Sequence, residues 1–340
     1  MRHSGAWFVR FLLFLACNST DPAVPSWQEV GLPVLTGVSN VQLAFGGAIP
    51  VVAGMEAGVL VIRRGIGGGW EDLSSNVLPA ASPAWRLAAL PDGSPLLLAS
   101  DPAAGYRAVF WQYTNGGWSN HGVLSAGAAH DPALRVQGGI FAACSDAGHG
   151  FRVRVLRLEG GLWIDTGEVS AGDGSAIALG GDAGGLLVAW ADWTLTGSPV
   201  VSRFAAGWSV LGGGACAGGW SEGLQVAAAP DGSTLVLFRE AGLTNRVLVF
   251  SGSAWEDAAP AGFPAQGACA LAAAGGTPRL AWLGSGGELL LGERTGTGWQ
   301  ASPGIALSNT NAVISLAVDA AGHPGVLLES AAGLRLYRYR

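Results

Sequence analysis

The stretch Arg246-Val247-Leu248-Val249-Phe250-Ser251-Gly252-Ser253-Ala254-Trp255 combines an alternating apolar strand, a turn of small residues, and a tryptophan that opens the next strand. Related copies recur along the chain and end at Trp27, Trp70, Trp118, Trp163, Trp208, Trp255 and Trp299. The intervals between these tryptophans are 43, 48, 45, 45, 47 and 44 residues. A fixed period of roughly 40–50 residues indicates a solenoid, a propeller or an array, and one four-stranded propeller blade needs about that length.

The fifth repeat shows how one unit is built. A short strand at 208–211 leads through a glycine-rich loop to a second strand at 224–228. Pro230-Asp231-Gly232 is then a turn, because proline fixes φ and glycine tolerates a positive φ. The almost wholly apolar segment 233–239 predicts a strand covered on both faces, and 246–250 alternates up to the next tryptophan. Each unit therefore predicts four strands.

Aspartates recur in the hairpin turns of several repeats, as in Asp92, Asp231 and Asp319. An aspartate in such a turn usually accepts a hydrogen bond from its own backbone. We therefore interpret these residues as structural, not as catalytic groups or metal ligands.

The two ends of the chain complement each other. The last repeat, 300–340, ends without a tryptophan, although 334–340 matches the strand that elsewhere precedes one. The missing piece is supplied by 26–30 at the other end. We expect seven units to close into a ring in this way, because closure protects the open strand edges.

These repeats, with an apolar strand, a Pro-Asp-Gly-like hairpin and a Gly-x-x-Trp hairpin in each, resemble seven-bladed β-propellers over residues 27–340. The resemblance implies an all-β fold of four-stranded antiparallel blades and extends to the fold alone. The marks of WD, kelch and sialidase repeats are absent. Repeats that end in tryptophan are also similar to those of sugar-binding propeller lectins.

Composition favours one well-packed domain and excludes several partners. The 340 residues are 49% hydrophobic and only 12% charged, which is the reverse of a disordered chain. The formal net charge is −6 and no basic run follows the leader, so we expect no nucleic-acid partner and little attraction to anionic lipid. We interpret 27–340 as a single domain and expect a monomer.

The N-terminus predicts export. Arg2 and Arg10 flank a short apolar segment, 11–16, that is too short to span a bilayer, so 1–16 is interpreted as a signal peptide. Leu15-Ala16-Cys17 resembles a bacterial lipobox, which implies that Cys17 is lipidated and that 17–26 is a polar tether. The alternative is an ordinary signal peptide cleaved nearby. Either way we expect the protein outside the cytoplasm, as an outer-membrane lipoprotein or in the periplasm or at the cell surface.

Three cysteines follow the leader. Cys216 and Cys269 lie near the entry to successive repeats, so a disulfide between neighbouring blades is geometrically conceivable, and two free buried thiols are the alternative. Cys144 lies in an apolar run and is interpreted as a small buried hydrophobe. The spacing does not resemble a zinc site, and we predict no metal and no cofactor.

Strand order places the candidate site. The regular hairpins share one face of the ring, so the longer, irregular connections share the other, and functional residues concentrate on variable loops carried by a rigid scaffold. The repeat tryptophans are explained by packing between blades, which leaves the residues outside the repeat as candidates. The candidate ligand-binding residues are Trp193, Trp220, Glu222, Asp192, His130 and Asp131. The alternative is that these are ordinary loop residues.

No catalytic residue is predicted, because His130-Asp131 lies beside no evident nucleophile. The sequence therefore favours a binding or scaffold module with a protein or glycan partner on the irregular-loop face. A sugar-binding propeller lectin is one alternative. A carbohydrate-active hydrolase using Glu222, Asp192 and Asp131 is the alternative from another class.

Overall fold

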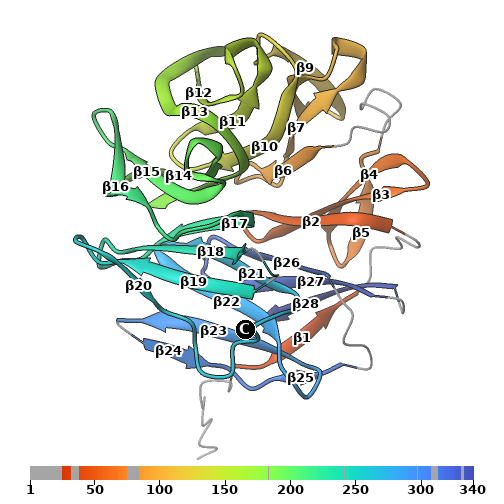
Figure 1. The fold of residues 1–340 in the computed structure, drawn as a ribbon. Coiled ribbons are helices and arrows are strands. Elements are labelled where there is room, and N and C mark those ends of the chain that lie inside the picture. The colour runs from red at the N-terminus through yellow and green to blue at the C-terminus, as the bar shows by residue number, and fades with distance from the viewer. Residues whose placement is uncertain are drawn as a thin grey trace, which may run out of the picture.

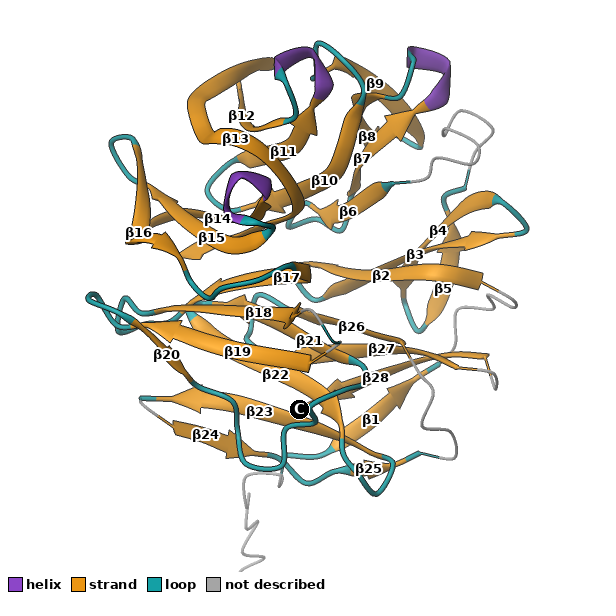
Figure 2. Ribbon diagram, in the orientation of Figure 1, coloured by secondary structure: helices purple, strands orange, loops and turns teal. Residues whose placement is uncertain are grey.

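The computed structural model describes residues 25–31, 38–74, 84–182, 184–240, 242, 244–296, 298–307, 313–330 and 333–340. Antiparallel sheets follow one another in chain order, and the C-terminus lies beside β1 (Figure 1). Strands dominate, and the helices in the described part of the chain are three short 3₁₀ turns (Figure 2). The predicted all-β propeller fold is confirmed. The predicted signal peptide and Cys17 lie outside the described residues.

Two four-stranded sheets begin the described domain. The first contains β2 (Val38–Gly46), β3 (Ile49–Glu56), β4 (Val59–Ile66) and β5 (Gly69–Asp72), in that order. The second contains β6 (Trp85–Ala89), β7 (Pro95–Asp101), β8 (Arg107–Thr114) and β9 (Gly117–Val123). The 3₁₀-helix η1 (Pro102–Ala104) lies between β7 and β8.

A seven-stranded sheet follows. Its strands are β10 (Ala129–Val136), β11 (Ile140–Asp146), β12 (Arg152–Glu159), β13 (Leu162–Asp182), β14 (Gly185–Asp192), β15 (Ser198–Phe204) and β16 (Trp208–Ala215). The helices η2 (Ala147–His149) and η3 (Trp193–Leu195) follow β11 and β14. The long strand β13 pairs with β12 through residues 162–173 and with β14 through residues 174–182, so it joins two groups of strands.

Three further sheets complete the chain. One contains β17 (Ser221–Ala228), β18 (Thr234–Glu240), β19 (Thr244–Phe250) and β20 (Trp255–Asp257). The next contains β21 (Cys269–Ala274), β22 (Thr277–Leu283), β23 (Glu288–Thr295) and β24 (Gly298–Ala301), with β25 (Ile305–Ala306) paired to β23. The last has the order β1-β28-β27-β26, from β1 (Trp27–Val30), β28 (Gly333–Tyr339), β27 (Pro324–Ser330) and β26 (Val313–Val318).

The strands next to the innermost ones form the core because both of their faces are covered. Strands β7, β14 and β18 are buried along most of their length, and their residues are mainly Leu, Val and Ala. A strand buried on both faces needs a continuous apolar run instead of an alternating one, which is the pattern that the sequence shows at 233–239. The apolar run at 233–239 therefore indicates that this strand lies in the interior of its sheet.

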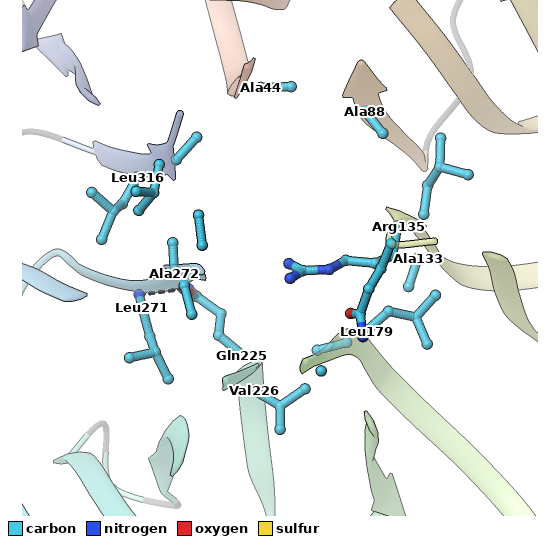
Figure 3. A pocket seen from close by; sticks show the side chains of 18 of the residues that line it. Ala44, Ala88, Ala133, Arg135, Leu179, Gln225, Val226, Leu271, Ala272 and Leu316 are labelled. Carbon is cyan, nitrogen blue, oxygen red and sulfur yellow. Dashed lines mark hydrogen bonds between the residues drawn. The ribbon is translucent and has the colours of Figure 1, made fainter. Parts of the chain in front are cut away.

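A central channel of about 1170 Å³ is lined by the first strand of each group of strands. These strands are β2, β6, β10, β13, β17, β21 and β26. Side chains from different sheets converge on this space (Figure 3). Many of these side chains are alanine or leucine, and arginine, asparagine and glutamine side chains lie among them.

Side chains on the innermost strands bond to the backbone of the neighbouring innermost strand. The amide of Gln42 donates to the carbonyl of Trp85 (3.0 Å) and accepts from the N–H of Leu87 (2.9 Å). Gln225 accepts from the N–H of Leu271 at 2.6 Å (Figure 3). Backbone groups at a sheet edge would otherwise be left unpaired, at a cost of ~1–3 kcal/mol for each buried group. These contacts hold adjacent sheets in register around the channel.

The repeat tryptophans fill the outer space between sheets. Six of the seven indole N–H groups donate to an oxygen at or just beyond the outer strand of the neighbouring group of strands. The acceptors are Pro303 O for Trp27, Gly31 O for Trp70, Leu73 O for Trp118, Thr166 Oγ1 for Trp208, Leu211 O for Trp255 and Ala258 O for Trp299. The predicted packing role of these tryptophans is confirmed.

The chain ends meet as the sequence indicates. β1 pairs antiparallel with β28, and Trp27 lies opposite Tyr339 with their rings in an edge contact at 5.2 Å. The backbones of Ser26 and Arg340 exchange two hydrogen bonds, at 2.7 and 3.1 Å. The outer edge of β28 is therefore covered by a strand from the other end of the described domain.

The turn aspartates bond their own backbone, as predicted. Asp92 accepts from the N–H of Ser94 and Asp231 accepts from the N–H of Ser233, both at 2.9 Å. Asp319 accepts from the N–H of His323 and also pairs with Arg338. Their structural interpretation is confirmed.

The alternative of a disulfide is wrong for this structure, because Cys216 and Cys269 are both free thiols. The two side chains pack against different apolar clusters, Cys216 against the one that contains Phe238 and Cys269 against the one that contains Trp282. Burial raises the pKa of the Cys269 thiol to about 11 and that of Cys144 to about 12. Each cysteine therefore behaves as a small hydrophobe.

Trp299 and Trp163 form a matched pair for testing the packing role. The Trp299 indole donates to the carbonyl of Ala258 at 2.6 Å, whereas the buried Nε1 of Trp163 has no partner. Both substitutions by phenylalanine remove similar volume, but only Trp299→Phe leaves a carbonyl unpaired. We expect Trp299→Phe to lower the free energy of unfolding by ~1 kcal/mol more than Trp163→Phe, measured by urea denaturation. Equal losses would show that the hydrogen bond contributes nothing.

Candidate functional site

Three loops on the irregular-loop face share one geometry. An aspartate precedes each 3₁₀-helix and its carboxylate accepts from the backbone N–H two residues later, at 2.9 Å in every case. The pairs are Asp101 with Ala103, Asp146 with Gly148, and Asp192 with Thr194. Such a cap satisfies an N–H that the first helical turn leaves free. Each loop is therefore held in a fixed shape by its own aspartate.

Each of these turns ends with two residues of positive φ. The first are Gly105, Gly150 and Thr196, with φ of 71°, 67° and 62°. The second are Tyr106, Phe151 and Gly197, with φ of 61°, 58° and 78°. A bulky residue in this conformation is strained by ~1–3 kcal/mol, and such strain clusters at binding sites. Tyr106 and Phe151 are 50% and 43% exposed, so the strained turns present aromatic rings to solvent.

Trp193 is the first residue of η3 and is 51% exposed. Its indole N–H donates to Ser175 Oγ at 2.9 Å, across to the bulged part of β13. The hydrogen bond restricts the indole while its remaining surface faces solvent. Trp193 is therefore an ordered aromatic surface.

Trp220 lies directly before β17 and is 41% exposed. Its ring packs on Gly197, where an added Cβ would lie 2.7 Å from the indole Cδ1. The N–H of the next residue, Ser221, donates to the carbonyl of Gly197 at 3.0 Å. The structure therefore brings Trp193 and Trp220, as predicted candidates, to the two ends of the single turn 193–197.

His130 and Asp131 belong to the same strip of surface. The His130 ring contacts the Phe151 ring at 5.6 Å. Asp131 has a φ of 49° and its Oδ2 accepts from the N–H of Ala176 at 2.9 Å. Ala176 follows Ser175, the acceptor for Trp193, so the two predicted residues connect to the Trp193 turn through the bulge of β13.

The other two predicted residues have structural partners. Asp192 is buried and accepts from the backbone N–H and the hydroxyl of Thr194, and from the Trp190 indole at 3.3 Å. Glu222 accepts from the Arg239 guanidinium at 2.6 Å. Asp192 thus supports the turn that presents Trp193. Glu222 follows Trp220 by two residues, and the Arg239 guanidinium balances its charge.

Tyr106 and Phe151 complete this surface but were not among the predicted site residues. Their signal in the sequence is an aspartate five residues earlier and a glycine directly before, in Asp101 to Tyr106 and in Asp146 to Phe151. The third copy, Asp192 to Gly197, has lost the aromatic residue there and has Trp193 inside the turn instead. Alignment of the three loops would have found all of these residues.

Asp146 shows how firmly the loops are held. Its buried carboxylate accepts from the N–H groups of Ala126, Gly127 and Gly148, and from the ring of His149, all at 2.9 Å. Burial alone would raise the pKa of Asp146, but these hydrogen bonds outweigh it and hold the pKa below its ordinary value. The loop between the second and third sheets is tied to η2 by this one side chain.

The described residues contain no group of three or more His, Cys, Asp or Glu side chains placed to hold a metal ion. No helix in the described ranges is both long and apolar enough to cross a membrane.

Replacing Asp146 by asparagine tests the loop anchor. The amide would turn an NH₂ group toward backbone N–H donors, so we expect Asp146→Asn to lower the free energy of unfolding by ~2–3 kcal/mol. Asp101→Asn is the control, because the half-buried carboxylate of Asp101 accepts a backbone hydrogen bond from Ala103, and we expect a loss below ~1 kcal/mol. Because the pKa of Asp146 is lower in the folded state than in the unfolded state, its carboxylate stabilises the fold above the unfolded-state pKa. This stabilisation is lost as the pH falls through the folded-state pKa. The wild-type advantage over Asp146→Asn should therefore shrink in urea titrations toward pH 3; a constant difference would contradict this account.

Solved structures that are similar in fold share little sequence with this chain. A variant of the Aleuria aurantia lectin in complex with Fucalpha1-6GlcNAc is 13% identical, with a TM-score of 0.50 over 79% of this chain and 96% of that one. The protein AofleA from Arthrobotrys oligospora is 12% identical, with a TM-score of 0.51 over 84% and 91%. A Mycobacterium tuberculosis puromycin-hydrolyzing peptidase is 14% identical, with a TM-score of 0.54 over 88% of this chain and 51% of the other. No protein-family model and no curated protein matches the chain. The likeness extends to the propeller fold alone.

Proposed function

We propose that the protein is a binding propeller that holds a glycan on its irregular-loop face, between and around Trp193 and Trp220. One observation carries this proposal: two large aromatic side chains from different sheets are exposed at the two ends of one rigid turn. Sugar rings have apolar faces that stack on flat aromatic surfaces, and the polar edge of the indole suits a partly wet interface. Exposed aromatic groups fixed in place lose little conformational entropy on binding.

The neighbouring groups on this face fit a sugar ligand. Tyr106 offers a further exposed aromatic ring, which carries a hydroxyl, and the His130 imidazole lies against Phe151. A ligand hydroxyl needs donors and acceptors of this kind around a central apolar contact. The fold is similar to that of the Aleuria aurantia lectin over most of the chain length, and this similarity supports a glycan as the ligand.

A hydrolase has no specific support. Each of the three predicted carboxylates is engaged: Asp192 with Thr194, Glu222 with Arg239, and Asp131 with the backbone of Ala176. A general acid or nucleophile needs a carboxyl group that is free to face substrate. Binding without catalysis therefore accounts for the arrangement with fewer assumptions.

We propose that the ring has seven blades closed by the N-terminal strand. Strand β13 is the last strand of one four-stranded group and the first of the next, which divides the seven-stranded sheet into two blades. Seven innermost strands line the channel, and seven outer strands carry the repeat tryptophans. Electron density with any other number of blades would overturn this count.

The glycan site is tested by substituting its aromatic residues. We expect Trp193→Ala and Trp220→Ala each to weaken binding of the best ligand on a glycan array by about tenfold or more, which corresponds to ~1.4 kcal/mol. Leu162→Ala is the control, since Leu162 is 72% exposed in the Gly160 to Leu162 hairpin, away from these loops. Circular dichroism should show all three variants folded. Unchanged binding in a folded Trp193→Ala, Trp220→Ala double variant would exclude this surface.

Export and anchoring complete the proposal, on the evidence of the leader sequence. We propose that residues 1–16 are removed and that Cys17 carries a lipid, which leaves the propeller outside the cytoplasm. In a bacterial host, wild-type protein should incorporate labelled palmitate and fractionate with membranes, whereas Cys17→Ser should lose both properties. Cys144→Ser is the matched control, because Cys144 is a buried core residue. A soluble, unlabelled wild-type protein would favour the alternative of ordinary signal cleavage.

A further inference from the structure

The central channel carries positive charge in a protein that is acidic overall. Three arginines, Arg86, Arg135 and Arg203, are among the described residues that line it, and none of those residues is Asp or Glu. The whole chain has a formal net charge of −6. The channel therefore has the opposite sign to the rest of the molecule.

Arg135 is the group that faces the channel most directly. It lies on β10, between Ala133 and Gln137, and its guanidinium extends toward the middle of the space (Figure 3). Its Nε is buried with no hydrogen-bond partner. Among the described residues, no carboxylate forms an ion pair with it. Burial lowers the pKa of Arg135, and no nearby negative charge opposes that effect.

The other two arginines are partly satisfied by the protein. Arg86 donates to the carbonyl of Trp85 at 2.9 Å, and the charge of Asp131 opposes the lowering of its pKa by burial. Arg203 donates to Gly232 O and Thr234 Oγ1. Arg203 therefore has neutral acceptors for its guanidinium, although its Nε is buried without a partner, whereas no acceptor among the described residues bonds to the guanidinium of Arg135. An arginine stays protonated even when buried, so its charge must be met by water or by an anion.

We propose that the channel is a binding site for a small anion bearing a carboxylate or phosphate group, held by the guanidinium of Arg135. The planar fork of arginine donates two parallel hydrogen bonds to such a group, which a single point charge cannot do. The volume of about 1170 Å³ exceeds what one inorganic ion needs, so the anionic group belongs to a small organic molecule. Its remaining atoms would lie against the alanine and leucine side chains of the wall, such as Ala272 and Leu316.

This site is separate from the loop-face site. It uses residues of the innermost strands, whereas Trp193 and Trp220 lie on the connections between strands. Glycan binding should therefore be the same in wild-type protein and in Arg135 variants. Failure of either site leaves the other intact.

Isothermal titration of the full folded chain with citrate, acetate and inorganic phosphate, at constant ionic strength set with sodium chloride, tests the proposal. We expect saturable binding of citrate or phosphate by wild-type protein and at least tenfold weaker binding by Arg135→Gln. Arg340→Gln makes the same charge change at an exposed residue, so it should bind like wild type. Arg135→Lys keeps the charge but loses the fork, and we expect intermediate affinity.

The comparison of ligands separates the two chemistries. Preference for citrate and acetate identifies a carboxylate ligand, and preference for phosphate identifies a phosphorylated one. Bound anion should also raise the thermal midpoint of wild-type protein but not that of Arg135→Gln, because only the folded state has the site. Without anion, Arg135→Gln should melt at the same or a higher temperature, since an unpaired charge has been removed.

Two results would overturn the proposal. The first is the absence of saturable binding to wild-type protein, which would mean that water alone solvates Arg135. The second is equal binding by wild type and Arg135→Gln. If Arg135→Gln fails to fold, Arg135→Lys decides, because unchanged affinity in that variant would also contradict bidentate recognition.

Discussion

The ring depends on contacts between neighbouring sheets at two radii, because each sheet alone would leave both of its edges unpaired. Near the channel, Gln42 and Gln225 bond to the backbone of the next innermost strand. At the periphery, indole N–H groups reach the adjacent outer strand, as in Trp299 to Ala258. The inner bonds fix the spacing of adjacent sheets and the outer tryptophans fill the wider space beyond. Loops that span two sheets can then be rigid, because the sheets that carry them do not move independently.

The propeller could be predicted from the sequence because each repeat uses the same residue types, and each of these types has one physical role. Tryptophan recurs where a wide gap must be filled, and the Pro230-Asp231-Gly232 turn recurs where a hairpin must reverse. The apolar run 233–239 marks a strand covered on both faces. The pairing of β1 with β28 followed from the missing tryptophan of the last repeat. The thiols of Cys216 and Cys269 could not be assigned in this way, because proximity along the repeat does not determine in which apolar cluster a side chain packs.

The loop surface was predicted only in part. Trp193 and Trp220 stand outside the repeat and were visible for that reason, and their approach to one turn is a tertiary contact that the sequence does not encode locally. Phe151 was missed because its exposure follows from a backbone conformation, the positive φ that ends the turn capped by Asp146. The sequence also does not distinguish a carboxylate that faces solvent from one that caps a helix. Asp192 is buried beneath the turn, whereas its neighbour Trp193 is exposed, although the two are adjacent in the chain.

Arg135 is the clearest case of a residue whose meaning depends on the closed ring. In the sequence it interrupts an apolar strand, where an arginine usually marks a side chain turned toward bulk water. In the structure the same direction leads into the central channel, where arginine, asparagine and glutamine side chains lie among alanine and leucine. Holding a cation there costs free energy, and none of the described lining residues is a carboxylate that could offset this cost. An apolar residue at this position would not carry that cost. A charged side chain that weakens the scaffold and faces an open space of ligand size is better explained by what it binds than by what it stabilises.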